Sequence, residues 1–143
     1  MDERTLTLPG RFENLAKISD FITQAARAAG FDADAVFHVQ MAVDEACSNV
    51  IEHAYGMDRS GDITLICRAD DRGDLRIEIV DYGRPFDPNR VPIPRIDPEH
   101  FDLDEMKVGG LGIFFMRKLM DEVTFYFDAN TGNHLTMIKR RPQ

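Results

Sequence analysis

The sequence has few cysteines, and its histidines lack the spacing of a zinc site. Its two cysteines, Cys47 and Cys67, lie in segments with regular hydrophobic patterns and do not form a C-x-x-C pair. The four histidines show no zinc-type spacing with cysteine or acidic residues. We therefore expect both thiols to be reduced and buried, as in a cytoplasmic protein, and predict no structural transition-metal site.

The sequence also lacks an excess of positive charge and any long hydrophobic run. With 17 Lys and Arg against 25 Asp and Glu, its formal net charge is −8, which disfavours binding to nucleic acid or to an anionic membrane. No apolar stretch approaches the roughly 20 residues of a membrane span, and no signal-peptide pattern opens the chain. At 143 residues, we expect a single cytoplasmic domain, residues 1–143, with its own core.

The stretch between Phe31 and Gly56 has the clearest helical pattern, because it contains neither glycine nor proline. Its polar face places Glu45 and Asn49 four residues apart, so that their side chains lie one turn from each other. A carboxylate can accept a proton or orient a nucleophile, and an amide oxygen suits Mg²⁺. The same pair would also fit an ordinary solvated surface. The opposite face is apolar and should pack into the core through Val36, Val39, Val43, Ala46, Val50 and Ala54.

The remaining hydrophobic patterns predict an α+β fold. Alternating or helical spacing indicates an edge strand at 5–8, helices at 13–29 and 113–120, and strands at 62–69, 75–81, 123–127 and 135–139. This order predicts a two-layer sandwich, with a mainly antiparallel mixed sheet and helices on one face. Between residues 83 and 100 lie five of the seven prolines, which exclude a regular element there. A loop of about 25 residues is usually functional or disordered.

Two glycine-containing motifs flank this loop. In the first, Asp81 follows a buried strand, where a lone carboxylate needs a partner, and Gly83 would let the backbone approach a flat ring closely. In the second, Gly109, Gly110 and Gly112 precede or open a helix, whose free N–H groups could bind phosphate. Taken separately, the first motif is also an ordinary turn and the second an ordinary glycine hinge. Together with the Glu45 helix, they match what an ATP site requires.

In this order, the motifs resemble those of the GHKL ATPases over roughly residues 5–140. The N box is matched by Glu45-x-x-x-Asn49 with Ala54-Tyr55, and the two glycine boxes by Asp81-x-Gly83 and Gly109-Gly110-x-Gly112-Ile113. Within that superfamily the chain most resembles the anti-sigma-factor serine/threonine kinases. The resemblance implies a single ATP-binding kinase domain with a flexible ATP lid at about 84–110.

The resemblance also implies roles for individual residues. Glu45 would be the general base and Asn49 the Mg²⁺ ligand, while Asp81 would accept from adenine N6. Gly83 would lie beneath the ring, and phosphate would be held by Gly109, Gly110 and Gly112. Phe86 and Lys107 are further nucleotide-binding candidates, although they would also serve as a loop anchor and a solvated lid charge.

The implied function is an ATP- and Mg²⁺-dependent protein kinase. It would phosphorylate a serine of a STAS-type anti-anti-sigma protein, sequester a sigma factor, and form a homodimer. One alternative is a nucleotide-binding partner-switching module without kinase activity, and another is a switch kinase that acts on a stress-signalling scaffold. Glu45 favours a kinase, because an inert module would not need the base.

Overall fold

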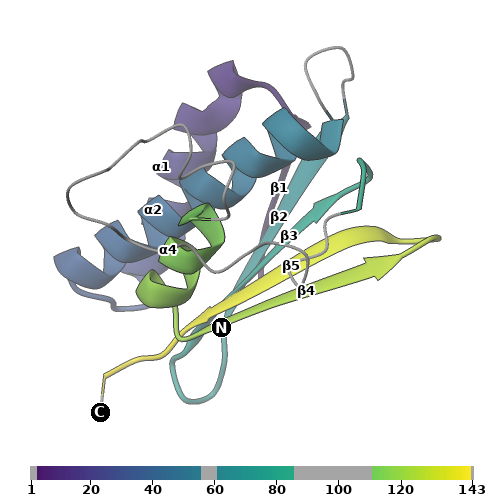
Figure 1. The fold of residues 1–143 in the computed structure, drawn as a ribbon. Helices are drawn as coiled ribbons and strands as arrows, with labels where there is room; N and C mark the ends of the chain where they lie inside the picture. Colours follow the sequence, from purple (N-terminus) through teal and green to yellow (C-terminus); the bar gives the residue numbers. More distant parts are fainter. Residues whose placement is uncertain (1–2, 56–60, 86–110, 143) are drawn as a thin grey trace, which may run out of the picture.

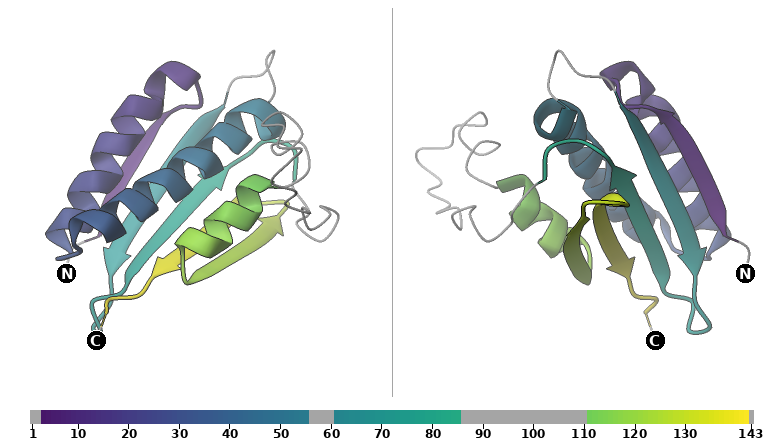
Figure 2. Two further views of the ribbon diagram at one scale, coloured as in Figure 1. Left: turned by 60° about the vertical axis from the view of Figure 1, so that its left-hand side comes forward. Right: turned by 90° about the vertical axis from the view of Figure 1, so that its right-hand side faces the viewer.

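The computed structural model describes residues 3–55, 61–85 and 111–142. Five strands form one sheet in the order β1-β2-β3-β5-β4, and α1, α2 and α4 cover one of its faces (Figures 1 and 2). The predicted two-layer α+β sandwich is therefore confirmed. The elements are β1 (Arg4–Pro9), η1 (Phe12–Asn14), α1 (Leu15–Ala28), α2 (Ala33–Asn49), η2 (Val50–Tyr55), β2 (Asp62–Ala69), β3 (Leu75–Asp81), α4 (Leu111–Leu119), β4 (Glu122–Asp128) and β5 (Gly132–Lys139).

All four strand pairs of the described residues are antiparallel. The sequence predicted a mixed sheet, but no parallel strand pair occurs among the described residues. The short strand at the N-terminus lies at the sheet edge, as predicted, and pairs with β2. The last described strand in sequence, β5, lies between β3 and β4, so that β3 is the central strand and β4 an edge strand of the sheet.

The hydrophobic core lies between the sheet and the helices. Alternate residues of the central strands are buried there, including Ile63, Leu65, Ile77, Ile79, Leu135 and Met137. The predicted core face of α2 is confirmed: five of the positions expected to pack inward are buried, and Ala54 is half-buried. Cys47 and Cys67 are buried and not disulfide-bonded, as expected, and burial raises the pKa of both thiols.

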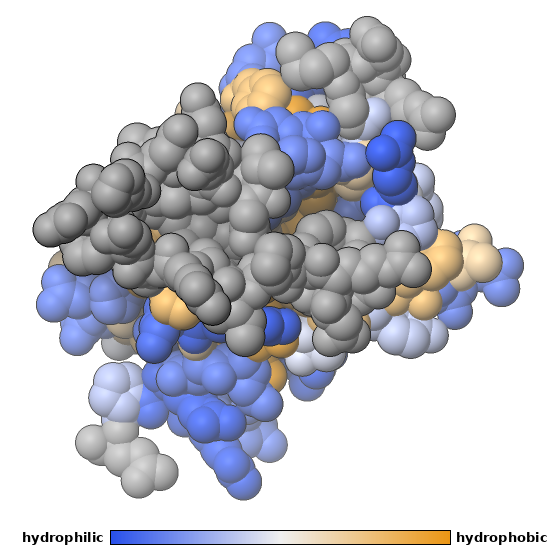
Figure 3. All heavy atoms as spheres, in the orientation of Figure 1, coloured by the Kyte–Doolittle hydropathy of each residue, from blue (hydrophilic) through white to orange (hydrophobic). Residues whose placement is uncertain are grey.

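The surface of the described residues exposes seven large apolar side chains: Phe12, Phe37, Met41, Tyr82, Phe115, Tyr126 and Phe127. Hydrophilic residues dominate the part of the surface visible around the grey segments in Figure 3. None of the helices in the described ranges is both long and apolar enough to cross a membrane.

The helix that carries Glu45 begins at a side-chain cap and ends in an irregular turn. The carboxylate of Asp32 accepts a hydrogen bond from the backbone N–H of Ala35 at 2.8 Å, which stabilises the first turn. After Asn49 the helix widens into the π-helix η2, whereas the sequence pattern predicted regular helix up to Gly56. Such π turns are rare in proteins, and those that occur are often found near functional sites. Here the widened turn brings Ala54 and Tyr55 into contact with the segment that follows β3.

Candidate functional site

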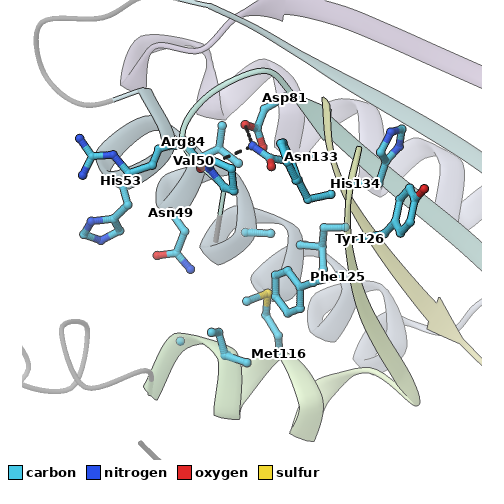
Figure 4. Close-up of a pocket in the computed structure, with 17 residues that line it drawn as sticks. Asn49, Val50, His53, Asp81, Arg84, Met116, Phe125, Tyr126, Asn133 and His134 are labelled. Carbon is cyan, nitrogen blue, oxygen red and sulfur yellow. Dashed lines mark hydrogen bonds between the residues drawn. The ribbon is translucent and has the colours of Figure 1, made fainter. Parts of the chain in front are cut away.

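A pocket of about 400 Å³ opens where α2 and η2 meet the end of β3, the start of α4 and the hairpin of β4 and β5. Asn49, Asp81 and Gly112, which the sequence analysis selected, all line it. Figure 4 shows the Asn49 side chain reaching into the open space from the end of α2. The three motifs, which follow one another at intervals of about 30 residues in the sequence, therefore each contribute a residue to the same pocket.

Glu45 lies one helical turn before Asn49 and is half-buried. Its carboxylate packs against Gly112, the second residue of α4, so closely that a Cβ at this glycine would overlap it. The first turn of a helix presents unpaired N–H groups and a partial positive charge, which favour a nearby carboxylate. The structure thus brings the predicted base and the last glycine of the second glycine motif into direct contact.

Asp81 is the last residue of β3, and its side chain is buried at the wall of the pocket. Its Oδ1 accepts hydrogen bonds from the backbone N–H of Gly83 at 2.9 Å and from Nδ2 of Asn133 at 2.8 Å. Burial raises the pKa of this carboxyl, and the two hydrogen bonds and the nearby His134 partly oppose that rise. All hydrogen bonds that Asp81 accepts from the described residues end on Oδ1, which leaves Oδ2 as an acceptor for a ligand.

Gly83 lies against the end of η2. A Cβ on this residue would lie 2.5 Å from the backbone carbonyl oxygen of Ala54, and the next residue, Arg84, donates its N–H to that oxygen at 2.7 Å. The absence of a side chain therefore lets the turn after β3 dock onto the helix end. Gly83 itself is not among the lining residues. Its placement beneath an adenine ring stays a prediction.

Tyr55 joins three segments beneath this turn. Its hydroxyl donates to the carbonyl oxygen of Asp62 at 2.6 Å and accepts from the backbone N–H of Tyr82 at 2.9 Å. The ring is buried and packs against Gly61, where a Cβ would overlap it. Burial raises the pKa of the phenol. Tyr55 therefore links the end of η2 to β2 and to the residue that follows Asp81.

Most residues of the pocket wall were not selected from the sequence, among them Asn133 and Met116. Asn133 lies opposite Asp81 in the pairing of β3 with β5, and its Nδ2 also donates to the carbonyl oxygen of Gly83 at 3.0 Å. Met116 of α4 is buried and also lines the pocket (Figure 4). The one available signal was the buried carboxylate of Asp81, because such a group requires a hydrogen-bond donor.

Four of the predicted nucleotide-binding residues lie outside the described residues: Phe86, Lys107, Gly109 and Gly110. The same holds for most of the predicted lid, of which only Arg84 and Pro85 are described, and both line the pocket. Within the described ranges, no group of three or more His, Cys, Asp or Glu side chains could hold a metal ion. A metal at this site would therefore need ligands such as the Asn49 amide oxygen.

The chain matches a known family over nearly its whole length. Residues 8–139 match the family described as histidine kinase-like ATPase domain. A relative from Bacillus licheniformis, the serine-protein kinase RsbW, is 31% identical over 93% of this chain and 83% of its own length. The serine-protein kinase RsbW of Listeria monocytogenes serovar 1/2a is 33% identical over 94% of this chain and 86% of its own length.

A solved structure shows the same fold. The RsbU and RsbW domains of a Mycobacterium tuberculosis protein match with a TM-score of 0.70 at 19% identity, covering 99% of this chain and 34% of that one. The pocket between α2, β3 and α4 thus lies in a fold shared with an RsbW domain. The chain belongs to the histidine kinase-like ATPase domain family, the family of the RsbW serine-protein kinases.

Proposed function

We propose that this chain is an ATP- and Mg²⁺-dependent serine/threonine protein kinase and anti-sigma factor. It phosphorylates a serine of a STAS-type anti-anti-sigma partner and sequesters a sigma factor in the cytoplasm. The kinase class rests on the serine-protein kinases to which the chain is similar. The observation that carries the site is the meeting of Asn49, Asp81 and Gly112 at one pocket, with Glu45 packed against Gly112.

Asp81 would recognise the base. Its Oδ2 is an acceptor at the wall of a pocket that is also lined by Val50, Met116 and Leu135. A flat aromatic ring gains from contact with such apolar side chains, while its exocyclic amine can donate to the carboxylate. This arrangement supports adenine as the base, with its N6 amine directed at Asp81.

Asn49 would hold the metal ion that accompanies the triphosphate. Mg²⁺ commonly binds one or two protein oxygens and completes its shell with phosphate oxygens and water, so a single amide oxygen fits it. When bound, Mg²⁺ would neutralise charge on the phosphates. Gly109, Gly110 and Lys107 are proposed to contact the phosphates near the start of α4, and Phe86 to contact the nucleotide.

Glu45 would act on the protein substrate. Phosphoryl transfer depends mainly on positioning and charge stabilisation, and a carboxylate near the acceptor orients the hydroxyl and accepts its proton. The contact with Gly112 keeps the Glu45 carboxylate at the start of α4, one turn from Asn49. A partner serine that enters from this side would meet the base next to the phosphates.

The experiment uses the purified chain, labelled ATP, Mg²⁺ and candidate STAS-domain proteins from the same genome. Wild type is expected to transfer label to a partner serine. Glu45→Gln should bind Mg·ATP with unchanged affinity and transfer label at least about 100-fold more slowly, as loss of a general base typically causes. Glu52→Gln is the matched control, because Glu52 is a half-buried carboxylate of the adjoining turn, and its one ion pair among the described residues is with His53 at 3.6 Å.

Two results would contradict the proposal. One is nucleotide binding by wild type without transfer to any STAS protein, which would favour the non-catalytic partner-switching module. The other is full transfer activity in Glu45→Gln. Co-purification of a sigma factor with the wild-type chain, released when the unphosphorylated STAS partner is added, tests sequestration separately, and gel filtration tests the proposed homodimer.

A further inference from the structure

Two exposed apolar side chains lie next to the contact between Glu45 and Gly112. Met41 lies four residues before Glu45 on α2, and Phe115 lies three residues after Gly112 on α4. Residues three or four apart share one face of a helix, so Met41 continues the face of Glu45 and Phe115 that of Gly112. Met41 is 45% exposed and Phe115 44%. Each of the two helices therefore places an accessible apolar residue one turn from the proposed base.

The opposite directions of the two helices bring these residues to the same side of Glu45. α2 and α4 pack against each other, and Figure 2 shows α4 running back from the end of α2 toward its start. One turn back along α2 and one turn forward along α4 thus lead to the same end of the helix pair. Helical side chains lean toward the N-terminus of their helix, so Glu45 leans toward Met41 and Phe115 toward Gly112. We call Met41 and Phe115 the apolar rim.

The nucleotide pocket lies on the other side of Glu45. Its wall includes Asn49, one turn after Glu45, but neither residue of the apolar rim. A nucleotide in this pocket would fill the space toward η2 and leave the side toward the rim open. A serine that meets both Glu45 and the phosphates must therefore belong to a protein that covers the rim, because its polypeptide cannot share the volume of the nucleotide.

α4 gives this surface a positive border. Its two charged residues are Arg117 and Lys118, both exposed, although the chain as a whole has a formal net charge of −8. Lys118 lies three residues after Phe115, on the same helix face, and its Nζ is 5.4 Å from the centroid of the Phe114 ring. A carboxylate on the bound protein would complement this cation, and salt would screen the attraction.

We propose that the apolar rim anchors the protein that carries the acceptor serine. The STAS-domain partner of the proposed function packs an apolar side chain against Met41 and Phe115 and places a carboxylate opposite Lys118. Its serine then meets Glu45 one helical turn away. A few such anchors supply most of the binding energy of an interface, and charges at its edge mainly affect the rate of association. The inference rests on the proposed function, because the chain must transfer phosphate to this partner.

The test measures the steady-state transfer of label from ATP to the STAS-domain protein that wild type phosphorylates, using the full chain. Met41→Gln and Phe115→Gln remove apolar surface with a residue that favours helix. Each should raise KM for the protein substrate about tenfold or more, as expected for loss of one interface anchor. The kcat and the Kd of Mg·ATP should not change, because neither residue lines the nucleotide pocket.

Phe12→Gln is the matched control, because Phe12 is also 45% exposed but lies in η1, before α1. This variant should keep the wild-type KM, and so should Met41→Leu, which retains an apolar side chain. Circular-dichroism melts compare the folding of all variants with that of wild type. Should Phe115→Gln fail to fold, Phe115→Ala decides by the same KM.

Lys118→Gln tests the positive border of the rim. The KM of wild type for the protein substrate should rise as the NaCl concentration is raised, because salt screens the attraction between Lys118 and the partner's carboxylate. This rise should be smaller in Lys118→Gln. An equal rise in both proteins would contradict the predicted acidic character of the partner at this position.

An unchanged KM in both Met41→Gln and Phe115→Gln would overturn the inference. If these variants also lost self-association in gel filtration, the rim would instead be a contact with a second copy of the chain. Neither result would affect the proposed kinase function, because wild type and variants would still transfer label. Absence of transfer by wild type to any STAS protein would contradict the proposed function and the docking inference together. The wild-type reaction thus distinguishes the two failures.

Discussion

Replacing Tyr55 by phenylalanine should destabilise the whole domain, although only one oxygen atom is removed. The hydroxyl of Tyr55 donates to the carbonyl oxygen of Asp62 at 2.6 Å and accepts from the N–H of Tyr82 at 2.9 Å. Phenylalanine preserves the packing of the buried ring against Gly61. The variant therefore tests the two hydrogen bonds that connect η2 to β2 and to the segment after β3.

The magnitude follows from the number of lost hydrogen bonds. Each contributes about 0.5–1.5 kcal/mol net, so the pair should lower the free energy of unfolding by about 2 kcal/mol. For a domain of this length, such a loss corresponds to a decrease in Tm of about 6–8 °C. Urea unfolding followed by circular dichroism measures the first quantity and a thermal melt the second.

Tyr126→Phe is the matched control. Tyr126 is 59% exposed, and the one hydrogen bond of its hydroxyl to the described residues goes to Oδ2 of Asp128, at 3.3 Å. We expect its removal to change the free energy of unfolding by less than about 0.5 kcal/mol, as for other surface changes. If Tyr55→Phe were no less stable than Tyr126→Phe, the assigned role of the Tyr55 hydroxyl would be wrong.

The alkaline pH dependence provides a second test of Tyr55. Burial raises the pKa of its phenol in the folded state above the usual 10. The neutral form is thus favoured by folding, and its contribution is complete below pH 10 and lost as the pH rises through the folded-state pKa. The stability difference between wild type and Tyr55→Phe should therefore shrink above pH 10. A difference that is constant into the alkaline range would contradict this reasoning.

Two further predictions concern the ligand. Asn49→Ala should weaken ATP binding about tenfold or more in the presence of Mg²⁺ but change it little in EDTA. If adding Mg·ATP raised the Tm of the variant as much as that of wild type, the assignment of Asn49 as the metal ligand would be wrong. Burial raises the pKa of Asp81 above 3.8, so ATP affinity should fall as the pH drops through that raised value, where the carboxylate gains a proton and no longer accepts. In ATP titrations from pH 4 to 7, Asp81→Asn should abolish this decrease in affinity at acidic pH. The substitution leaves the other titratable or charged groups near Asp81 in place, namely His134, Tyr55, Cys47 and Arg84.

The strands around the pocket could be predicted closely because their side chains alternate between core and solvent. In β2 the buried face carries Ile63, Leu65 and Cys67, and the other face carries Thr64, Ile66 and Arg68. The alternation therefore predicts both the bounds and the orientation of the strand. The same argument predicted β3 and placed Asp81 at its end, where its side chain meets the pocket. Local patterns were sufficient wherever one face of an element contacts the core.

Asn133 and η2 could not be predicted because each depends on contacts between distant segments. Asn133 meets Asp81, which is 52 residues away in the chain, only because β5 lies between β3 and β4 and pairs with both. The π-helical turn coincides with hydrogen bonds from Arg84 to Ala54 and from Tyr82 to Tyr55, which helical periodicity does not reveal. Glu45 and Asn49, in contrast, could be placed on one helix face from spacing alone, whereas their roles came from the family resemblance and stay predictions.

The two described glycines of the motifs have packing roles that do not require a nucleotide. Gly83 admits the backbone of Ala54, and Gly112 admits the side chain of Glu45, so each glycine brings a separate segment against the helix formed by α2 and η2. A side chain at either position would push that segment outward. The glycines thus set the shape of the pocket, whereas the proposed chemistry depends on the polar side chains of Glu45, Asn49 and Asp81. A sequence that keeps both glycines but loses these polar groups should retain the pocket without its nucleotide specificity.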